Sequence, residues 1–231
     1  MSNVFCFIPA RAGSKQIPNK NIKELGSKPL IVWTIECALK AGLSRVIVNT
    51  DGEEIAKIAR EAGAEVMIRP AQLAKDETTM FQVLNSEIPK IEPLPEMVLL
   101  LQPTSPFRKK IHIKLAIEIL SKSPEYDSLL SVERIPEKYH PAQVIIMTPL
   151  GPRMANGAPI SQRSARRQDF PIAYLPTGSI YLFRTKNLKT GSFYSEKIAL
   201  LETEPEININ DFNDFEKAAN YLSALTKNGS S

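Results

Sequence analysis

The sequence predicts an α/β protein in which a mainly parallel sheet is flanked by helices. Short apolar runs at 4–8 and 97–101 indicate buried strands, and such runs alternate with segments of helical periodicity. The chain has 231 residues, of which 43% are hydrophobic, so it is long enough for one large domain with a sizeable core. Strand–helix alternation of this kind favours a parallel sheet with helices on both faces.

The first half of the chain supplies most of these elements. The strand at 4–8 is followed by a helix that opens at 27–29 and closes at Gly42. After a strand at 45–49, Asp51 and Glu54 fit a capping pattern for a helix that ends at Gly63. The next expected elements are a strand at 65–68, a helix at 78–88, a strand at 97–101, a helix to about residue 122 and a strand at 128–132.

The pattern then breaks over residues 133–172, which are rich in proline and arginine and show no clean periodicity. A stretch of this length without core signals is usually functional or an interaction arm. Periodicity returns at 178–183 and 197–201, and a last helix carries apolar residues on one face from Phe215 to Leu225. We therefore expect one domain, 1–231, with an inserted arm at 133–172.

Charge is distributed unevenly along a chain whose formal net charge is +4. One basic patch lies within residues 11–40 and a second holds Arg163, Arg166 and Arg167. Two separate patches suit a nucleoside triphosphate and an acidic co-substrate. Nucleic acid is the weaker interpretation, because no basic stretch is interleaved with aromatic residues.

The two cysteines and the apolar runs indicate the compartment. Cys6 and Cys37 lie at apolar positions, as expected of free thiols in a reducing cytoplasm. No run approaches the roughly 20 apolar residues that a membrane-spanning helix needs. We expect a soluble, cytoplasmic protein without a membrane partner.

The first loop, residues 9–21, is the strongest candidate site. It leaves the carboxyl end of the first strand and carries Arg11, Lys15 and Lys20. Open α/β sheets bind ligands at this edge, where backbone N–H groups can cradle phosphate and cations can neutralise it. An ordinary solvated basic loop explains the composition equally well.

Three later segments also admit two interpretations each. Asp51 fits a helix cap better than a catalyst. The stiff Gln102-Pro103-Thr104-Ser105-Pro106 segment is either a strand-exit turn or a partner for a polyhydroxylated ligand. The segment 163–169 is either a solvated loop or a source of guanidinium groups for a carboxylate or phosphate.

In combination, these motifs resemble the CMP-sialic acid synthetases, a family that includes legionaminic and pseudaminic acid cytidylyltransferases. The resemblance begins with Arg-x-x-Ser-Lys-x-x-x-x-Lys-Asn at 11–21 and covers nearly the whole chain, from residue 4 to about 222. Its other motifs are, in order, Thr50-Asp51-Gly52, Leu73-Ala74-x-Asp76, the segment Gln102 to Arg108, Arg167-Gln168 and Gly178-x-Ile180-Tyr181.

The resemblance implies a Rossmann-like nucleotidyltransferase fold whose arm builds a homodimer and completes the neighbouring site. It implies transfer of CMP from CTP to the anomeric hydroxyl of a nine-carbon acidic sugar, with release of pyrophosphate. The implied catalytic residues are Arg11, Lys15 and Lys20. The implied nucleotide-binding residues are Ala10, Arg11, Ser14, Asn21, Arg69 and Thr79. The implied sugar-binding residues are Gln102, Arg167, Tyr181, Phe193 and Tyr194.

The carboxyl-terminal motif departs from this family. Two aspartates that bind Mg²⁺ (or Mn²⁺) in the family are replaced by Asn208 and Asn210, and asparagine is a weaker Mg²⁺ ligand than a carboxylate. Asp211 either substitutes as a ligand or caps the last helix. Two alternatives therefore stay open, a CMP-Kdo-type synthetase and a non-catalytic nucleotide-binding relative with a degraded metal site. Met80 lies where hydroxyl residues are common in the family, and Thr177 lies where asparagine is common. Both suggest a sugar other than the commonest sialic acid.

Overall fold

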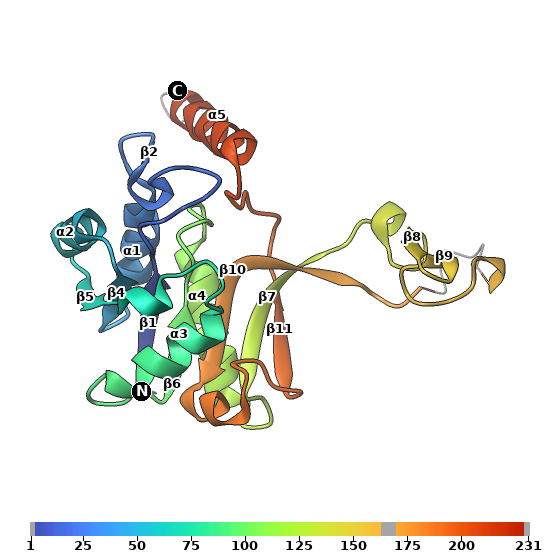
Figure 1. Ribbon diagram of the computed structural model, residues 1–231, viewed down its shortest axis with the longest axis horizontal. Coiled ribbons are helices and arrows are strands. Elements are labelled where there is room, and N and C mark those ends of the chain that lie inside the picture. Colours follow the sequence, from blue (N-terminus) through green and yellow to red (C-terminus); the bar gives the residue numbers. More distant parts are fainter. Residues whose placement is uncertain (1–2, 163–169, 229–231) are drawn as a thin grey trace.

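The computed structural model describes residues 3–162 and 170–228, and its central feature is a seven-stranded sheet (Figure 1). The strand order is β11-β7-β10-β6-β1-β4-β5, and all neighbours are parallel except β10, which runs antiparallel to both β6 and β7. The predicted fold class, a mainly parallel sheet flanked by helices, is confirmed. The strands are β1 (Val4–Pro9), β4 (Val46–Thr50), β5 (Glu65–Ile68), β6 (Met97–Leu100), β7 (Ser128–Arg134), β10 (Tyr174–Arg184) and β11 (Ile198–Glu202).

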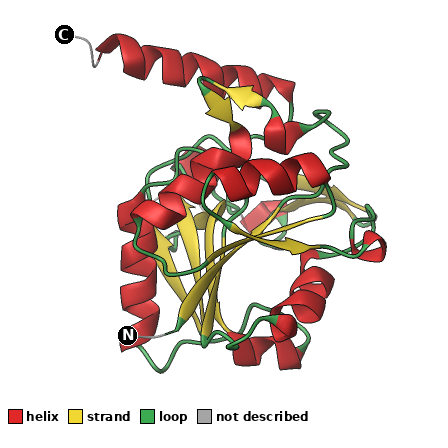
Figure 2. Cartoon of the chain, turned by 90° about the vertical axis from the view of Figure 1, so that its left-hand side faces the viewer, coloured by secondary structure: helices red, strands yellow, loops and turns green. Residues whose placement is uncertain are grey.

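The alternation of side chains along β1 explains why both faces of the sheet are covered. Cys6 and Ile8 belong to one apolar cluster with α1, α2 and α4, whereas Phe5 and Phe7 belong to a second cluster with α3. Successive residues of a strand point to opposite faces, so a wholly apolar strand requires a layer on each side. Figure 2 shows helices on both sides of the sheet. The helices are α1 (Leu30–Lys40), α2 (Glu53–Glu61), α3 (Met80–Glu87), α4 (Lys110–Lys122) and α5 (Phe212–Asn228).

Helix α5 belongs to a third, smaller cluster at one end of the body. Its residues Phe215 and Ala218 are buried with Leu25 and Leu30, next to the short ribbon of β2 (Glu24–Leu25) and β3 (Lys28–Pro29). Ile209, in the segment before α5, is completely buried in the same cluster. This cluster fixes the carboxyl-terminal segment against the first loop, because Ile17 of that loop is also a member.

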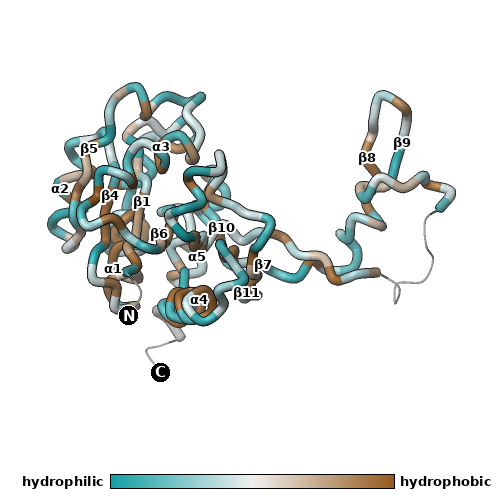
Figure 3. Tube along the Cα trace, turned by 90° about the horizontal axis from the view of Figure 1, so that it is seen from below, coloured by the Kyte–Doolittle hydropathy of each residue, from teal (hydrophilic) through white to brown (hydrophobic). Residues whose placement is uncertain are grey.

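The segment predicted as an arm leaves the body between β7 and β10. Figures 1 and 3 show it as a long extension that carries the hairpin of β8 (Ile145–Thr148) and β9 (Gly151–Met154). One hydrogen bond, from Ile135 N to Ala173 O at 3.0 Å, closes its base. Short 3-10 turns complete the chain: η1 (Lys20–Ile22), η2 (Ala71–Leu73), η3 (Ile88–Lys90), η4 (Glu137–Tyr139), η5 (Ile160–Gln162) and η7 (Thr185–Thr190).

Several local predictions can be compared with the structure. Gly42 and Gly63 follow α1 and α2 with φ of 89° and 90°, as predicted for residues that end helices. The predicted cap at Asp51 is wrong, because Gly52 is the N-cap residue of α2 and no side chain caps it. Cys6 is buried and Cys37 half-buried, and both are free thiols. Across the described ranges, no helix is long and apolar enough to cross a membrane.

Candidate functional site

The candidate site lies where the strand order reverses. Strand β1 pairs with β4 on one side and β6 on the other, so the loops after β1 and β6 diverge and leave a crevice between them. A cavity of about 390 Å³ opens there, lined by the first loop, by Arg69 after β5, and by residues 102–104 after β6. The seven predicted site residues among its walls are Arg11, Ser14, Lys15, Lys20, Asn21, Arg69 and Gln102.

Four cations converge on this cavity, namely Arg11, Lys15, Lys20 and Arg69. Lys15 is the most accessible, with 71% of its side chain exposed, whereas the Lys20 ammonium donates to Ile209 O at 3.1 Å. Burial, and secondly the Arg11 guanidinium, lower the pKa of Lys20 below its ordinary value. Such an excess of positive charge in a crevice favours a polyanion.

Asp76 is not among the residues that line the cavity, but it forms ion pairs with two of these cations. Its Oδ1 lies 2.6 Å from Arg11 Nη1 and its Oδ2 lies 2.8 Å from Lys15 Nζ. Hydrogen bonds from Lys15 and Arg11 lower the pKa of the Asp76 carboxyl. The sequence motif Leu73-Ala74-x-Asp76 contained this residue, but no site role was predicted for it.

Two hydrogen bonds to the body and one within the loop hold the conformation of the first loop. Ala12 N donates to Asp51 Oδ1 at 2.9 Å, so Asp51 orients the loop and does not cap the helix. Ala10 N donates to Asn49 O at 3.0 Å, and Asn21 Nδ2 donates to Arg11 O at 3.0 Å. Asn21 therefore lines the cavity and also fixes the backbone of the residue that carries the guanidinium.

Arg69 is fixed by a buried polar network that the sequence did not reveal. The guanidinium donates from Nε to Asn49 Oδ1 at 2.6 Å and from Nη2 to Asn49 O at 3.1 Å. Asn49 in turn donates to the carboxylate of Glu87, which is 1% exposed. Burial lowers the pKa of Arg69. A polar residue at the end of an apolar strand is the one signal that could have pointed to Asn49.

The remaining predicted nucleotide residues have structural partners. Ala10 is buried directly after β1. Thr79 is the N-cap residue of α3, where its Oγ1 accepts a hydrogen bond from Gln82 N at 3.2 Å as part of a capping box. Thr79 is not among the residues that line the cavity. Its role in nucleotide binding stays a prediction.

The predicted sugar wall forms an aromatic cluster beyond Gln102. The ring centroids of Phe193 and Tyr194 are 4.3 Å apart, and Tyr181 lies 6.3 Å and 6.2 Å from them. Tyr181 pairs with Leu100, two residues before Gln102, so the cluster is placed next to the loop after β6. Burial raises the pKa of Tyr194 to about 12. The predicted carboxylate partner Arg167 lies outside the described residues.

The proposed metal ligands do not form a carboxylate site. Asn208 Nδ2 donates to Thr177 O at 3.4 Å, and its buried Oδ1 has no hydrogen-bond partner among the residues described. Asp211 Oδ1 accepts from Asp214 N at 2.9 Å, and Asp214 Oδ2 accepts from Asn210 N at 3.1 Å, which are capping contacts of α5. No group of three or more His, Cys, Asp or Glu residues in the described ranges could hold a metal ion.

The sequence of this chain is similar to those of several cytidylyltransferases. The sequence model of a family described as cytidylyltransferase matches residues 5–204. N-acylneuraminate cytidylyltransferase of Escherichia coli O18:K1:H7 is 34% identical over 221 residues, which cover 94% of this chain and 51% of that protein. CMP-N,N'-diacetyllegionaminic acid synthase of Legionella pneumophila is 35% identical over 199 residues, covering 84% of this chain and 83% of that protein. The chain thus spans about half the length of the N-acylneuraminate relatives it matches.

Solved structures support the same architecture. CMP:2-keto-3-deoxy-manno-octonic acid synthetase, in complex with CTP, superposes with a TM-score of 0.74 at 19% identity, covering 96% of this chain and 99% of that one. A 4-diphosphocytidyl-2C-methyl-D-erythritol synthase from Anaerococcus prevotii superposes with a TM-score of 0.69 at 15% identity, covering 96% of each chain. At these identities the likeness establishes the fold alone.

Proposed function

We propose that this chain, which belongs to the cytidylyltransferase family, transfers CMP from CTP to the anomeric hydroxyl of a nine-carbon acidic sugar and releases pyrophosphate. The observation that carries the proposal is the convergence of Arg11, Lys15, Lys20 and Arg69 on one cavity at the strand switch point. A triphosphate is the ligand that such a concentration of positive charge favours. The resemblance inferred from the sequence motifs is confirmed by the family match.

The proposed reaction requires positioning and charge neutralisation more than covalent help from the protein. The sugar hydroxyl oxygen attacks the α-phosphorus in line, the bond to pyrophosphate breaks, and the hydroxyl proton leaves to solvent. Arg11, Lys15 and Lys20 neutralise the phosphoryl oxygens, and the same cations stabilise the negative charge that develops on the leaving pyrophosphate. Asn21 and Arg69, with the loop backbone, are proposed to recognise cytidine.

A nine-carbon sugar is favoured over a Kdo-type substrate by the comparisons. The relatives named for N-acylneuraminate and N,N'-diacetyllegionaminic acid are 34% and 35% identical to this chain, whereas the structure of the Kdo-type enzyme is 19% identical. Gln102 and the cluster of Tyr181, Phe193 and Tyr194 are the proposed contacts to the sugar. Arg167 is the proposed partner for its carboxylate.

Mg²⁺ (or Mn²⁺) is the cofactor we propose, since divalent cations usually share the neutralisation of a triphosphate. Asn208, Asn210 and Asp211 do not fit a tightly held ion, because two of them are neutral amides and the third caps α5. The chemistry that such an ion would supply is charge neutralisation on phosphate oxygens. The Oδ1 of Asn208, which has no hydrogen-bond partner among the described residues, is one neutral oxygen that remains for it.

We propose further that residues 1–231 form a single cytidylyltransferase domain and that the arm at 133–172 builds a homodimer. The tip of the arm exposes apolar side chains, with Met147 79% and Leu150 85% accessible. Large apolar side chains gathered on an extended hairpin are typical of a protein interface. A second copy of this chain, with its own arm, is the proposed partner.

The test of the function is pyrophosphate release from CTP with N-acetylneuraminic acid, N,N'-diacetyllegionaminic acid and Kdo, each with and without Mg²⁺ or Mn²⁺. Metal-dependent release with a nine-carbon sugar supports the proposal, and release with Kdo alone would favour the Kdo-type alternative. CTP binding without release for any sugar would favour a non-catalytic relative, for which Asn208 and Asn210 are the supporting observation. No CTP binding at all would contradict the assignment of the cavity.

A further inference from the structure

The side chain of Arg108 connects three elements behind the cavity. It is 4% exposed and donates from Nε to Ser179 O at 2.6 Å, from Nη2 to Gln102 O at 2.9 Å and from Nη1 to Thr34 Oγ1 at 3.3 Å. These acceptors belong to β10, to the loop after β6 and to α1, respectively. A guanidinium can reach three separate acceptors because its donors form a rigid planar fork.

The loop that contains Gln102 has little backbone support of its own. Within residues 102–108 it has two prolines, which cannot donate, and its internal backbone bond, from Ser105 N to Gln102 O, is 3.5 Å long. The same carbonyl of Gln102 is the one that Arg108 holds at 2.9 Å. The guanidinium thus supplies the stronger constraint on the backbone of the proposed sugar-binding residue.

The second anchor of Arg108 is an irregularity in β10. The register with β7 shifts between Pro176 and Tyr181, and Gly178 has φ of 72°. Ser131 of β7 holds this bulge from one side, since its Oγ accepts from Ile180 N at 2.8 Å and lies 2.7 Å from Thr177 Oγ1. Arg108 holds it from the other side through Ser179 O.

The bulge places two groups of the proposed acceptor site. A Cβ atom at Gly178 would lie 2.5 Å from Asn208 Nδ2 and at an ordinary contact distance of 3.7 Å from the hydroxyl of Tyr181, so both side chains lie directly against the bulge. Arg108 therefore fixes two backbone segments. Gln102 belongs to the first, the loop after β6, and Tyr181 and Asn208 lie against the second, the bulge of β10.

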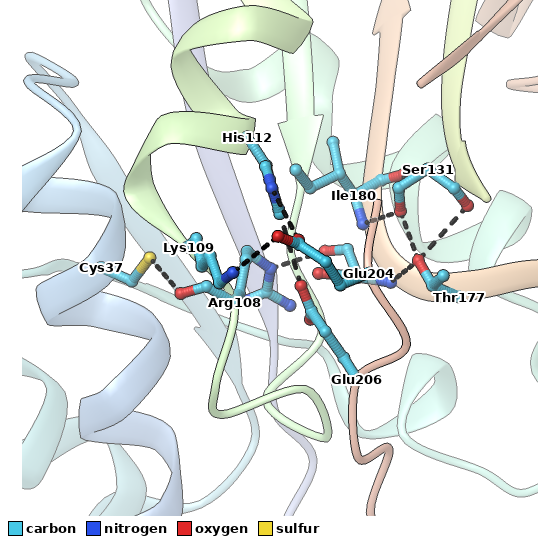
Figure 4. Close-up of polar contacts among 10 residues, drawn as sticks. Cys37, Arg108, Lys109, His112, Ser131, Thr177, Ile180, Glu204 and Glu206 are labelled. Atoms are coloured by element: carbon cyan, nitrogen blue, oxygen red, sulfur yellow. Dashed lines mark hydrogen bonds and ion pairs between the residues drawn. The ribbon is translucent and has the colours of Figure 1, made fainter. Parts of the chain in front are cut away.

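Folding alone does not account for a charge at this position. None of the three acceptors of Arg108 is charged, and burial lowers its pKa, an effect that Cys37 and Glu206 oppose. The Glu206 side chain is 7% exposed, and neither of its carboxylate oxygens has a hydrogen-bond partner in the described part of the chain. Figure 4 shows both side chains in one cluster with His112, whose Nδ1 lies 3.7 Å from Glu206 Oε1. Apolar packing often gives equal or greater stability than such buried charges.

We propose that Arg108 is a positioning residue for the acceptor sugar, which holds the loop after β6 and the bulge of β10 at a fixed separation. The inference rests on the proposed function, because it assigns Gln102 and Tyr181 to the sugar. It does not involve the triphosphate cations, which lie on the first loop and after β5. Residues 102–104 also line the cavity, but none of its four cations lies on that loop, so we expect loss of the fork to weaken sugar binding far more than CTP binding.

The experiment compares wild type with Arg108→Lys, which keeps the charge and loses the fork. KM for N,N'-diacetyllegionaminic acid, or for N-acetylneuraminic acid where that is the better substrate, is measured beside the CTP dissociation constant by calorimetry. We expect the sugar KM to rise roughly tenfold or more while CTP affinity changes by less than about twofold. Lys109→Arg is the matched control, since Lys109 pairs with Glu204 outside the three anchors.

A parallel loss of CTP and sugar affinity, or an unchanged sugar KM in folded Arg108→Lys, would overturn the positioning role. If that variant does not fold, Thr34→Val removes only the acceptor of Nη1 and is nearly isosteric. For Thr34→Val we expect the sugar KM to rise about two- to fivefold while CTP affinity stays nearly unchanged. Equal changes for both substrates would overturn the positioning role. A wild type that binds CTP but turns over no sugar overturns the proposed function, and the positioning role with it.

Discussion

Asp76 Oδ2 forms an ion pair with Lys15 Nζ at 2.8 Å, and Lys15 is one of four cations that line the cavity. The second oxygen of the same carboxylate lies 2.6 Å from Arg11 Nη1. A carboxylate that bridges two cations occupies the donors that a phosphate group would use. We therefore expect Asp76 to compete with the proposed triphosphate for Arg11 and Lys15.

Asp76→Asn is expected to strengthen CTP binding. The amide keeps the shape of the side chain and removes its negative charge, so Arg11 and Lys15 are released to the nucleotide. Because both ion pairs are exposed to solvent, we expect an increase in affinity of only about two- to fivefold, which shrinks as ionic strength rises. Calorimetric titration with CTP at low and high NaCl measures it.

Asp127→Asn is the matched control, because Asp127 pairs with Lys186 at the opposite edge of the sheet. Weaker CTP binding by Asp76→Asn would contradict the competition and show that the carboxylate orients the cations for the nucleotide.

Lys20 gives a prediction for the alkaline side of the pH profile. Burial, and secondly Arg11, lower its pKa, so this ammonium loses its proton at a lower pH than an ordinary lysine. The charge of Lys20, which is proposed to bind phosphate, is present below that pKa and is lost as pH rises through it. We expect kcat/KM for CTP to fall at alkaline pH, and Lys20→Arg to move this fall to higher pH.

The measurement is the profile of kcat/KM against pH for wild type, Lys20→Arg and the control Lys57→Arg, which changes an exposed lysine of α2. If all three profiles fell together, another group would have to account for the alkaline limb.

Much of the fold could be predicted from periodicity, but the arm hairpin could not. Strands such as β6 are wholly buried, so their residues must be apolar and the pattern is visible in the sequence. Strand β8 has three exposed residues followed by one half-buried residue, and a hairpin without a core on either face leaves no such pattern. The irregular composition at 133–172 indicated an arm but not its strands.

Some residues of the candidate site could also be predicted from the sequence, whereas others are brought together only by the fold. The first loop could be predicted because its cations are close together in the sequence, whereas Asp76 is 65 residues from Arg11. Asp51 was expected to cap a helix by its local pattern, but a tertiary partner, Ala12 N, takes its oxygen. Arg108 follows a proline-rich turn, where an arginine is usually solvated, and only the packing of three elements buries it.

The arm gives a prediction for assembly. Met147 and Leu150 are the most exposed large apolar residues described; Met147 lies in β8, and Leu150 lies in the turn between β8 and β9. If they pack on a second copy, the double variant Met147→Glu and Leu150→Glu places two charges in an apolar interface. We expect the dimer dissociation constant to rise by roughly a hundredfold or more, measured by light scattering across a dilution series.

Leu94→Glu is the control for this variant, because Leu94 is 54% exposed on the body, away from the arm. A double variant that stays as dimeric as wild type would exclude the hairpin tip from the interface. A monomeric wild type would contradict the proposed homodimer itself.

The two asparagines give the prediction for the metal. Asn208 has a buried oxygen without a described partner, while the carboxylates of Asp211 and Asp214 accept hydrogen bonds at the start of α5. Replacing Asn208 and Asn210 together by aspartate supplies two carboxylates on the same segment, next to the cavity cation Lys20, which contacts Ile209 O. Carboxylates are the ligands that Mg²⁺ prefers, so we expect Mg²⁺ affinity of the free protein to rise at least about tenfold.

Titration with Mg²⁺ in the absence of CTP, followed by calorimetry or by electron paramagnetic resonance with Mn²⁺, measures this affinity independently of turnover. Asn213→Asp is the control for a nearby added carboxylate, since it places one negative charge within the first turn of α5. If the double variant Asn208→Asp and Asn210→Asp bound Mg²⁺ no better than wild type, the neutral amide side chains would not be the cause of a low Mg²⁺ affinity. The position of the segment, which the capping contacts at the start of α5 fix, would then be the limiting factor.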